Sequence, residues 1–377
     1  MTSSPGRPGQ RPGVRQPPGT QRLAARTFRR ILLIKPSSLG DLVHALPVLH
    51  GLRQRYPRAR IDWLAGAAFA PLVEGHPDLN EVIRFDRRRF GRIARSPKIT
   101  WEFAGFLADL RRRRYDLVVD LQGLFRSGLM ALATGAEVRI GFAAARELAW
   151  VFYTHRMQVT DGQTHAVDRN YVVSRMLGFE DVPMTFDLAV TAGRRDRAAE
   201  ILRDAGVDPD AAFVAVMPGA RWETKRWPAE RFAELVDALV DRRGFPCVLL
   251  AGPDEARICS RIETRCRHRP TSLAGRTGLD ELVAVLERAA VVICHDSAPM
   301  HLAAALDRPL VCILGPTSPA RTGPYSPAAK VLQADWPCVP CYLRRLSQCR
   351  YDHRCMTSIG PEQVIEAVIA VLGPGGE

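Results

Sequence analysis

The chain has 377 residues, of which 46% are hydrophobic and 25% are charged, and its formal net charge is +13. This composition is that of a globular protein, and the length suits two domains of ~150 residues each rather than one core. No run approaches the ~20 apolar residues that span a bilayer, and the N-terminus has no apolar signal-peptide core, so we expect the folded part to stay in the cytoplasm.

The first 30 residues hold seven arginines and no acid, and they are rich in proline and glycine. Such a segment buries too little apolar surface to offset the entropy of ordering, so we predict a disordered basic tail over 1–30. Its arginines suit peripheral contact with an anionic inner membrane, and a plain solvated extension is the alternative. No basic stripe is interleaved with aromatic residues, which argues against specific nucleic-acid binding.

The first folded element is predicted at Ile31–Ile34, because four aliphatic residues without alternation suit a strand covered on both faces. A Pro/Ser/Gly turn follows, and helical periodicity then resumes. Pro47 lacks a backbone donor, so the helix should kink or restart there. Further strands are predicted at 61–65, 81–85 and 116–120, with helical stretches around 69–74 and 101–113.

Periodicity is lost around 184–195, where we place a linker, and the second half then repeats the alternation of strand and helix. Strands are predicted at 213–217, 247–251, 291–294 and 310–314, and helices at 228–244, from 254, at 279–288, from 298 and at 361–372. This alternation implies parallel β-α-β units. The expected fold class is α/β, with two Rossmann-like doubly wound domains, 31–188 and 189–377, facing a central cleft.

The turn after the first strand is the first candidate site, because ligands of open parallel sheets bind beyond the carboxyl ends of the strands. It contains Ser37, Ser38, Gly40 and Asp41. Gly40 allows close backbone approach, and Asp41 is the nearest candidate base, with a role as helix cap as its alternative. The turn lacks G-x-G-x-x-G, which weakens the alternative of a dinucleotide-dependent dehydrogenase.

Two loops of the second half also follow strands and open helices. The first includes Arg221 and Lys225. A departing diphosphate needs its charge neutralised, and Lys225 near a helix N-terminus can do this without a metal, although an ordinary exposed lysine is the alternative. The second loop includes Asp296 and Ser297, which can cap the helix, contact a ligand or do both.

Three stretches occur in order along the chain. They are K-P-S-S-L-G-D-L-V-H-A-L-P at 35–47, P-G-A-R-W-E-T-K-R-W-P at 218–228, and D-S-A-P-M-H-L-A-A-A-L with G-P-T at 296–306 and 315–317. Together they resemble the lipopolysaccharide heptosyltransferases of glycosyltransferase family 9. The resemblance spans 31–372 and implies a GT-B fold and an inverting transfer of heptose from ADP-heptose to a lipopolysaccharide core acceptor, without a catalytic cofactor.

By this resemblance, Asp41 corresponds to the catalytic aspartate, Lys225 to the diphosphate-binding lysine and Asp296 to the donor-sugar aspartate. The other residues expected at the donor are Ser37, Ser38, Gly40, Arg221, Gly275, Arg276, Thr277, Ser297, Met300 and His301. One departure is Ala298, where the family usually has glycine. An alanine is costly there if the position needs a positive φ.

Basic residues of the first half suit an acidic acceptor, because guanidinium forks bind carboxylate and phosphate in bidentate fashion. The acceptor-side residues expected from position or from resemblance are Arg87, Arg88, Arg89, Gln122, Arg126 and Arg146. Another nucleotide-sugar transferase or an epimerase is the alternative among enzymes. A basic nucleic-acid-binding protein is the alternative outside them.

Four of the nine cysteines lie close together in the sequence, in a chain with no export signal and therefore no expected disulfides. Cys338-x2-Cys341-x7-Cys349-x5-Cys355 could close a tetrahedral site for structural zinc or iron. The x7 and x5 spacings match no standard zinc module, and reduced free thiols are the alternative.

Overall fold

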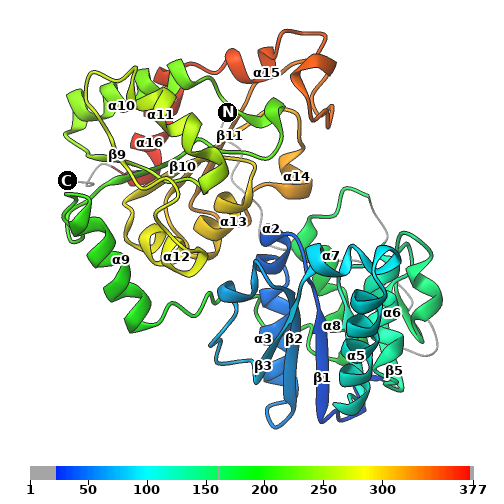
Figure 1. Ribbon diagram of the computed structural model, residues 1–377. Helices are drawn as coiled ribbons and strands as arrows, with labels where there is room; N and C mark the ends of the chain where they lie inside the picture. The colour runs from blue at the N-terminus through cyan, green and yellow to red at the C-terminus, as the bar shows by residue number, and fades with distance from the viewer. Residues whose placement is uncertain (1–22, 160–161, 374–377) are drawn as a thin grey trace.

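The computed structural model describes residues 23–159 and 162–373, and Figure 1 shows them as two lobes. The N-terminal lobe is built on a sheet of parallel strands in the order β3-β2-β1-β4-β5-β6. Its strands are β1 (Arg30–Ile34), β2 (Arg60–Gly66), β3 (Glu81–Phe85), β4 (Leu117–Asp120), β5 (Val138–Phe142) and β6 (His155–Met157). The aliphatic run of β1 is fully buried, as its lack of alternation predicts.

Most helices of this lobe connect its strands, and the last two follow β6. They are α2 (Leu39–Val43), α3 (Leu46–Arg55), η1 (Ala70–Leu72), α4 (Arg87–Phe90), η2 (Ile93–Arg95), α5 (Pro97–Arg112), α6 (Phe125–Ala133), η3 (Ala149–Phe152), α7 (Ala166–Tyr171) and α8 (Val173–Leu177). Pro47 lies in the first turn of α3, where its missing donor has no helical partner to lose. The predicted restart at this proline is confirmed.

The C-terminal lobe repeats the plan with the order β12-β11-β10-β7-β8-β9, again all parallel. Its strands are β7 (Val214–Met217), β8 (Cys247–Leu249), β9 (Thr271–Ser272), β10 (Val291–His295), β11 (Leu310–Leu314) and β12 (Ala329–Gln333). Its helices are α9 (Ala192–Asp204), η4 (Glu223–Lys225), α10 (Ala229–Arg243), η5 (Pro253–Glu255), α11 (Ala256–Glu263), α12 (Leu279–Arg288), α13 (Ala298–Ala305), α14 (Pro319–Thr322), η6 (Leu346–Gln348), α15 (Arg354–Thr357) and α16 (Pro361–Leu372).

Both sheets therefore share one strand order. In each lobe the first strand lies at the centre, the next two extend to one side and the last three to the other. The direction of chain progression reverses between β1 and β4 in one sheet and between β7 and β10 in the other. Ligands of open α/β sheets bind at such switch points, so the loops after these four strands are the expected site.

The predicted tail over 1–30 is wrong for its last part. Leu23 and Phe28 are each 2% exposed, and Phe28 packs edge-on against Tyr56. Arg26 forms a bidentate ion pair with Glu137. Apolar side chains at these two positions therefore recruit the segment into the core, whereas residues 1–22 lie outside the described part of the chain. No helix among the described residues is long and apolar enough to cross a membrane.

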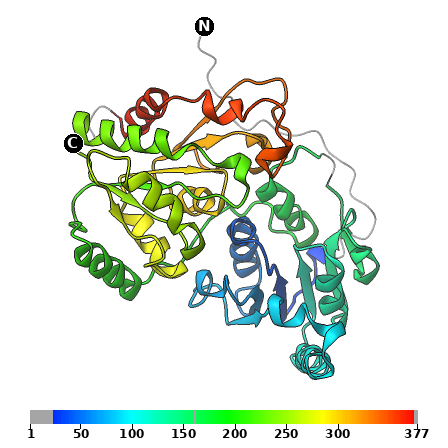
Figure 2. The same ribbon diagram turned by 45° about the horizontal axis from the view of Figure 1, so that its top comes forward.

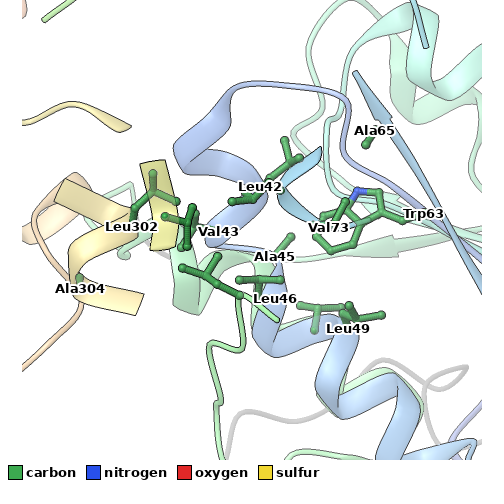
Figure 3. Close-up of a cluster of buried hydrophobic side chains, with 14 of the residues drawn as sticks. Leu42, Val43, Ala45, Leu46, Leu49, Trp63, Ala65, Val73, Leu302 and Ala304 are labelled. Atoms are coloured by element: carbon green, nitrogen blue, oxygen red, sulfur yellow. The ribbon is translucent and has the colours of Figure 1, made fainter. Parts of the chain in front are cut away.

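The two lobes meet where α2 packs against α13, at the junction visible in both views (Figures 1 and 2). Val43 of α2 and Leu302 of α13 belong to one buried apolar cluster that continues across the junction (Figure 3). Gly40 makes the close approach possible, since a Cβ there would lie 2.4 Å from the Cδ2 atom of His301. A larger residue at position 40 would push the lobes apart.

Candidate active site

Asp41 lies in the first turn of α2, directly beyond the carboxyl end of β1. Its Oδ2 atom accepts hydrogen bonds from the backbone N–H and the hydroxyl of Ser38, both at 2.7 Å. Its Oδ1 atom lies 3.6 Å from Nζ of Lys35, whose ammonium also donates to the carbonyl of Leu121. The Asp41 side chain is 42% exposed, so it caps its helix and still faces outward.

The surroundings of Asp41 keep its carboxylate charged. Burial alone would raise the pKa of Asp41, but the Lys35 ammonium and the two hydrogen bonds from Ser38 outweigh it and lower the pKa to about 2. The carboxylate is therefore ionised at neutral pH and free to accept a proton.

Lys225 and Asp296 form an ion pair in the C-terminal lobe. Lys225 follows β7 in η4, and its Nζ atom donates to a carboxylate oxygen of Asp296 at 2.7 Å and to the Asp296 carbonyl at 3.0 Å. The two side chains are 14% and 5% exposed. The Lys225 ammonium also lies 4.5 Å from the ring centre of Trp222. An anion arriving here would meet a cation already held in place beside a helix N-terminus.

The N-terminus of α13 carries further predicted donor residues. Ser297 is its N-cap, and Ala298, the first helical residue, is not among the residues with positive φ. The alanine is therefore accommodated without strain. The Met300 side chain is completely buried, with its sulfur 3.1 Å from that of Cys312, so a donor contact of this side chain stays a prediction. The position of Met300 in α13 directs its side chain into the apolar core.

His301 lies one turn into α13 and meets the N-terminal lobe. Its Nδ1 atom is 2.9 Å from Nε2 of His44, the residue that ends α2. Burial lowers the pKa of His301 to about 4, and the charge of Asp41 opposes this shift while that of Lys225 adds to it. His301 thus lies within electrostatic reach of both the candidate base and the candidate diphosphate lysine.

Comparison with known proteins bears on this arrangement. The sequence model described as glycosyltransferase family 9 (heptosyltransferase) matches residues 104–352. The chain belongs to glycosyltransferase family 9. Lipopolysaccharide heptosyltransferase 1 of Pseudomonas aeruginosa is 31% identical over 362 residues, covering 91% of this chain and 98% of that protein.

Solved structures agree with this family 9 assignment. A glycosyl transferase family 9 protein from Veillonella parvula matches with a TM-score of 0.78 and 25% identity over 91% of this chain and 97% of its own. Escherichia coli heptosyltransferase WaaC with ADP matches with a TM-score of 0.71 and 28% identity over 90% of this chain and 100% of its own. The protein is therefore a glycosyltransferase, and the predicted α/β GT-B fold is confirmed.

The residues predicted to bind the acceptor are mostly arginines. Gln122 accepts a hydrogen bond from the backbone N–H of Ser37 at 3.3 Å, which joins the loops after β4 and β1. Arg126 lies in the first turn of α6, and Arg146 follows β5; neither has an ion-pair partner in the part of the chain that the structure describes. Arg89, by contrast, is paired with Glu102 of α5. Its predicted acceptor contact is less favoured than those of the exposed Arg87 and Arg88.

The remaining donor residues lie at the same edge of the second sheet. Arg221 is exposed in the loop after β7, and Gly275 has φ +72° just beyond β9, followed by exposed Arg276 and half-buried Thr277. β9 is the outermost strand on its side of the sheet. These three residues therefore lie further from the switch point than Lys225 and Asp296 do.

The predicted metal site is not supported. Across residues 23–159 and 162–373, no group of three or more His, Cys, Asp or Glu side chains is arranged to hold a metal ion. Cys355 is buried in the apolar core of its lobe, where burial raises its pKa to about 11. The neighbouring His353 directs its Nε2 atom to the carbonyl of Thr224 at 2.8 Å. The His353 ring therefore contacts the loop that carries Lys225, while its backbone N–H donates to Sγ of Cys349 at 3.4 Å.

The Cys-rich segment instead braces the loop that carries Lys225. The backbone N–H of Glu223 donates to the Arg344 carbonyl at 3.1 Å, and the hydroxyl of Thr224 donates to the Leu343 carbonyl. Arg344 also lies 5.0 Å from the ring centre of Trp222, on which Lys225 rests. We call residues 342–353 the brace.

Sequence reasoning missed three residues near this site. Lys35, His44 and Arg169 are brought there by contacts between distant segments. Arg169 interacts electrostatically with both Asp41 and Arg146, so it adds a further cation near the Asp41 carboxylate. Lys35 could have been found, since a lysine ending a buried strand needs a partner.

Proposed function

We propose that this protein transfers heptose from ADP-heptose to an acidic sugar of the lipopolysaccharide core, with inversion at the anomeric carbon. One observation carries the proposal. Gly40, the residue before Asp41, lies against His301 of α13, and Asp296 with its partner Lys225 lies at the N-terminus of the same helix, so the carboxylate and the lysine lie at one junction between the lobes. Relatives named lipopolysaccharide heptosyltransferases, and a solved heptosyltransferase with bound ADP, support this choice of donor and acceptor.

In the proposed reaction, the Asp41 carboxylate accepts the proton of an acceptor hydroxyl while that oxygen bonds to the anomeric carbon. The bond from this carbon to the diphosphate oxygen breaks on the opposite face, and ADP leaves. Lys225 and the N-terminal amides of α13 stabilise the charge that develops on the diphosphate. Asp296, released from Lys225 by the diphosphate, can accept hydrogen bonds from sugar hydroxyls. The proposal assigns no step to a cofactor.

The acceptor is proposed to be acidic because of cations in the N-terminal lobe that lack an ion-pair partner. Arg169 interacts electrostatically with Asp41 and with Arg146. Arg126 lies in the first turn of α6, and none of these three arginines has an ion-pair partner among the residues that the structure describes. Arg169 is exposed and lies 4.5 Å from the ring centre of Phe142. Carboxylate and phosphate groups of a lipopolysaccharide core would neutralise this group. Because that acceptor is membrane-bound, we also propose peripheral contact with the anionic inner membrane, through residues 1–22.

The deciding experiment is incubation of the purified protein with ADP-heptose and a panel of lipid-linked core acceptors, followed by mass spectrometry of the product. We expect the acceptor to gain one heptose and ADP to be released in equal amount. Transfer from UDP-sugars but not from ADP-heptose would show that the donor is a UDP-sugar. Isomerisation of the nucleotide sugar without transfer would indicate an epimerase, and binding of nucleic acid without any turnover would refute an enzymatic role.

A further inference from the structure

The contact between His44 and His301 joins the two lobes at their closest point. His44 ends α2 in the N-terminal lobe and His301 belongs to α13 in the C-terminal lobe, with 4% and 8% of their surfaces exposed. Their ring centres are 4.2 Å apart and nearly perpendicular, and the Nε2 to Nδ1 distance is 2.9 Å. No other side-chain hydrogen bond in the described residues joins α2 to α13.

His44 is itself held firmly. Its carbonyl accepts a hydrogen bond from the side chain of Asn170 in α7 at 3.1 Å, and its ring lies 5.6 Å from that of His165. His165 makes a second contact across the junction, because its Nε2 atom is 3.1 Å from the carbonyl of Gly323. The N-terminal lobe therefore presents His44 to α13 from a rigid support.

The contact with His44 also selects the tautomer of His301. The Nδ1 atom of His44 is buried without a partner, so it is better accommodated as a bare acceptor than as an N–H donor. His44 then carries its proton on Nε2 and donates it to Nδ1 of His301. His301 must carry its own proton on Nε2, at the ring edge that lies against Gly40, beside the negative charge of Asp41.

We propose that His44 is a positioning residue for the transfer reaction. By donating to His301 it fixes the tautomer and ring orientation of that side chain, and it holds the helix bearing Asp41 at a fixed distance from the helix that receives the donor. This inference rests on the proposed function, because it assigns Asp41 and α13 to the two halves of one reaction. The rate of the chemical step depends steeply on the distance between these two helices, whereas the affinity for a donor bound within one lobe does not.

The test compares three variants of the full-length protein. H44A removes the contact, and H44Q restores it, because the glutamine Nε2 reaches the position of the imidazole Nε2. H50A is the matched control: His50 makes a similar hydrogen bond, 3.2 Å to Asp78, inside the N-terminal lobe. We expect H44A to lower kcat by about 10- to 100-fold without raising KM for ADP-heptose, while H44Q and H50A stay within about threefold of the original.

A second measurement does not depend on activity. Hydrogen–deuterium exchange without substrate should be faster in H44A at both 39–44 and 298–305, and unchanged there in H50A. If the original protein fails to transfer heptose, the proposed function falls, and this exchange pattern still tests the contact. If H44A does not fold, H44N replaces it, since asparagine is too short to reach His301. Equal kcat in H44A and H50A, equal defects in H44A and H44Q, or unchanged exchange would overturn the proposal.

Discussion

Asp41 has a structural role as a helix cap and a proposed role as the general base. It caps α2 through Ser38, and it stays ionised beside Lys35 while 42% of its side chain remains exposed. The capping role does not require a charge, because a neutral amide oxygen accepts the same hydrogen bonds. The base role does require one. Substitution by asparagine therefore separates the two.

We predict that Asp41→Asn lowers transfer by about 10²- to 10⁴-fold while ADP binding is retained, because the base is lost and the shape is kept. Turnover by mass spectrometry and ADP titration by calorimetry check this. Asp86→Asn is the control, since Asp86 caps α4 through the N–H of Arg89 in the same lobe. Near-normal turnover in Asp41→Asn would reduce Asp41 to a cap.

For Lys225→Ala we predict at least a roughly tenfold loss of affinity for both ADP and ADP-heptose, because the ammonium contacts the diphosphate in ground and transition states alike. The melting temperature should also fall, since Asp296 is left buried without its cation. Calorimetry and thermal scans check both. Lys330→Ala, which removes an exposed lysine of the same lobe, is the control. Unchanged ADP affinity would remove Lys225 from the donor site.

Sequence reasoning placed residues well where strand position alone determines them. Asp41, Lys225 and Asp296 each follow a strand at a switch point, so a local pattern suffices. It did not anticipate contacts with partners outside the local segment. The sulfur of Met300 lies against that of Cys312, and Arg89 pairs with Glu102 thirteen positions away. No pattern within one segment contains that information.

At the scale of elements, the long periodic segments were predicted, and three of the four edge strands were not. The helix at 279–288 and the edge strand at 81–85 match α12 and β3 to the residue. β6 and β9 escaped prediction because they have only three and two residues, too few to show a period, and β12 because it is not fully buried and has no continuous apolar run.

The cysteine spacing predicted a metal site in the segment that contains the brace, whereas the brace contacts the loop that carries Lys225. We predict that His353→Ala weakens ADP binding by about three- to tenfold, because losing the hydrogen bond to the Thr224 carbonyl frees the loop that positions Lys225. Calorimetry with ADP measures it. His155→Ala is the control, because His155 lies on β6 in the other lobe. Chelator treatment should leave the affinity unchanged, and a loss on chelation would reinstate a metal in this segment.

At the scale of the whole molecule, the junction between the lobes is sensitive to acid. Burial lowers the pKa of His44 to about 2 and that of His301 to about 4, against about 6.5 when unfolded. The groups facing His44 are His301, Asp41, His165 and Lys35. Because the unfolded chain binds more protons below pH 6.5, stability is full above that pH and declines as the pH falls.

We therefore predict a lower melting temperature at pH 5 than at pH 7.5, with His44 contributing about 2 kcal/mol. Asp41 adds nothing in this window, because its lowered pKa matters only below about pH 4. Thermal scans of the original protein and of H44Q across this range check the sign. The decline should be shallower in H44Q, and parallel curves would show that His44 does not contribute.

The N-terminal residues divide into two parts with different roles. Deleting 1–22 should leave transfer to a water-soluble acceptor unchanged and weaken sedimentation with anionic vesicles, to which arginines contribute ~1 kcal/mol each. Deleting 1–30 should also destabilise the fold by about 3–5 kcal/mol, because Phe28 leaves the core. Equal vesicle binding before and after the first deletion would exclude recruitment by these residues.

The close contact over Gly40 has a consequence for the timing of the reaction cycle. Asp296 is 5% exposed and its carboxylate is paired with Lys225, so an arriving diphosphate has to displace Asp296 from the ammonium. We predict that loading and product escape each also require a separation of the lobes, which breaks and re-forms the contact between α2 and α13 over Gly40. Turnover should slow in viscous solvent whenever that swing, rather than bond breaking, is the slowest event.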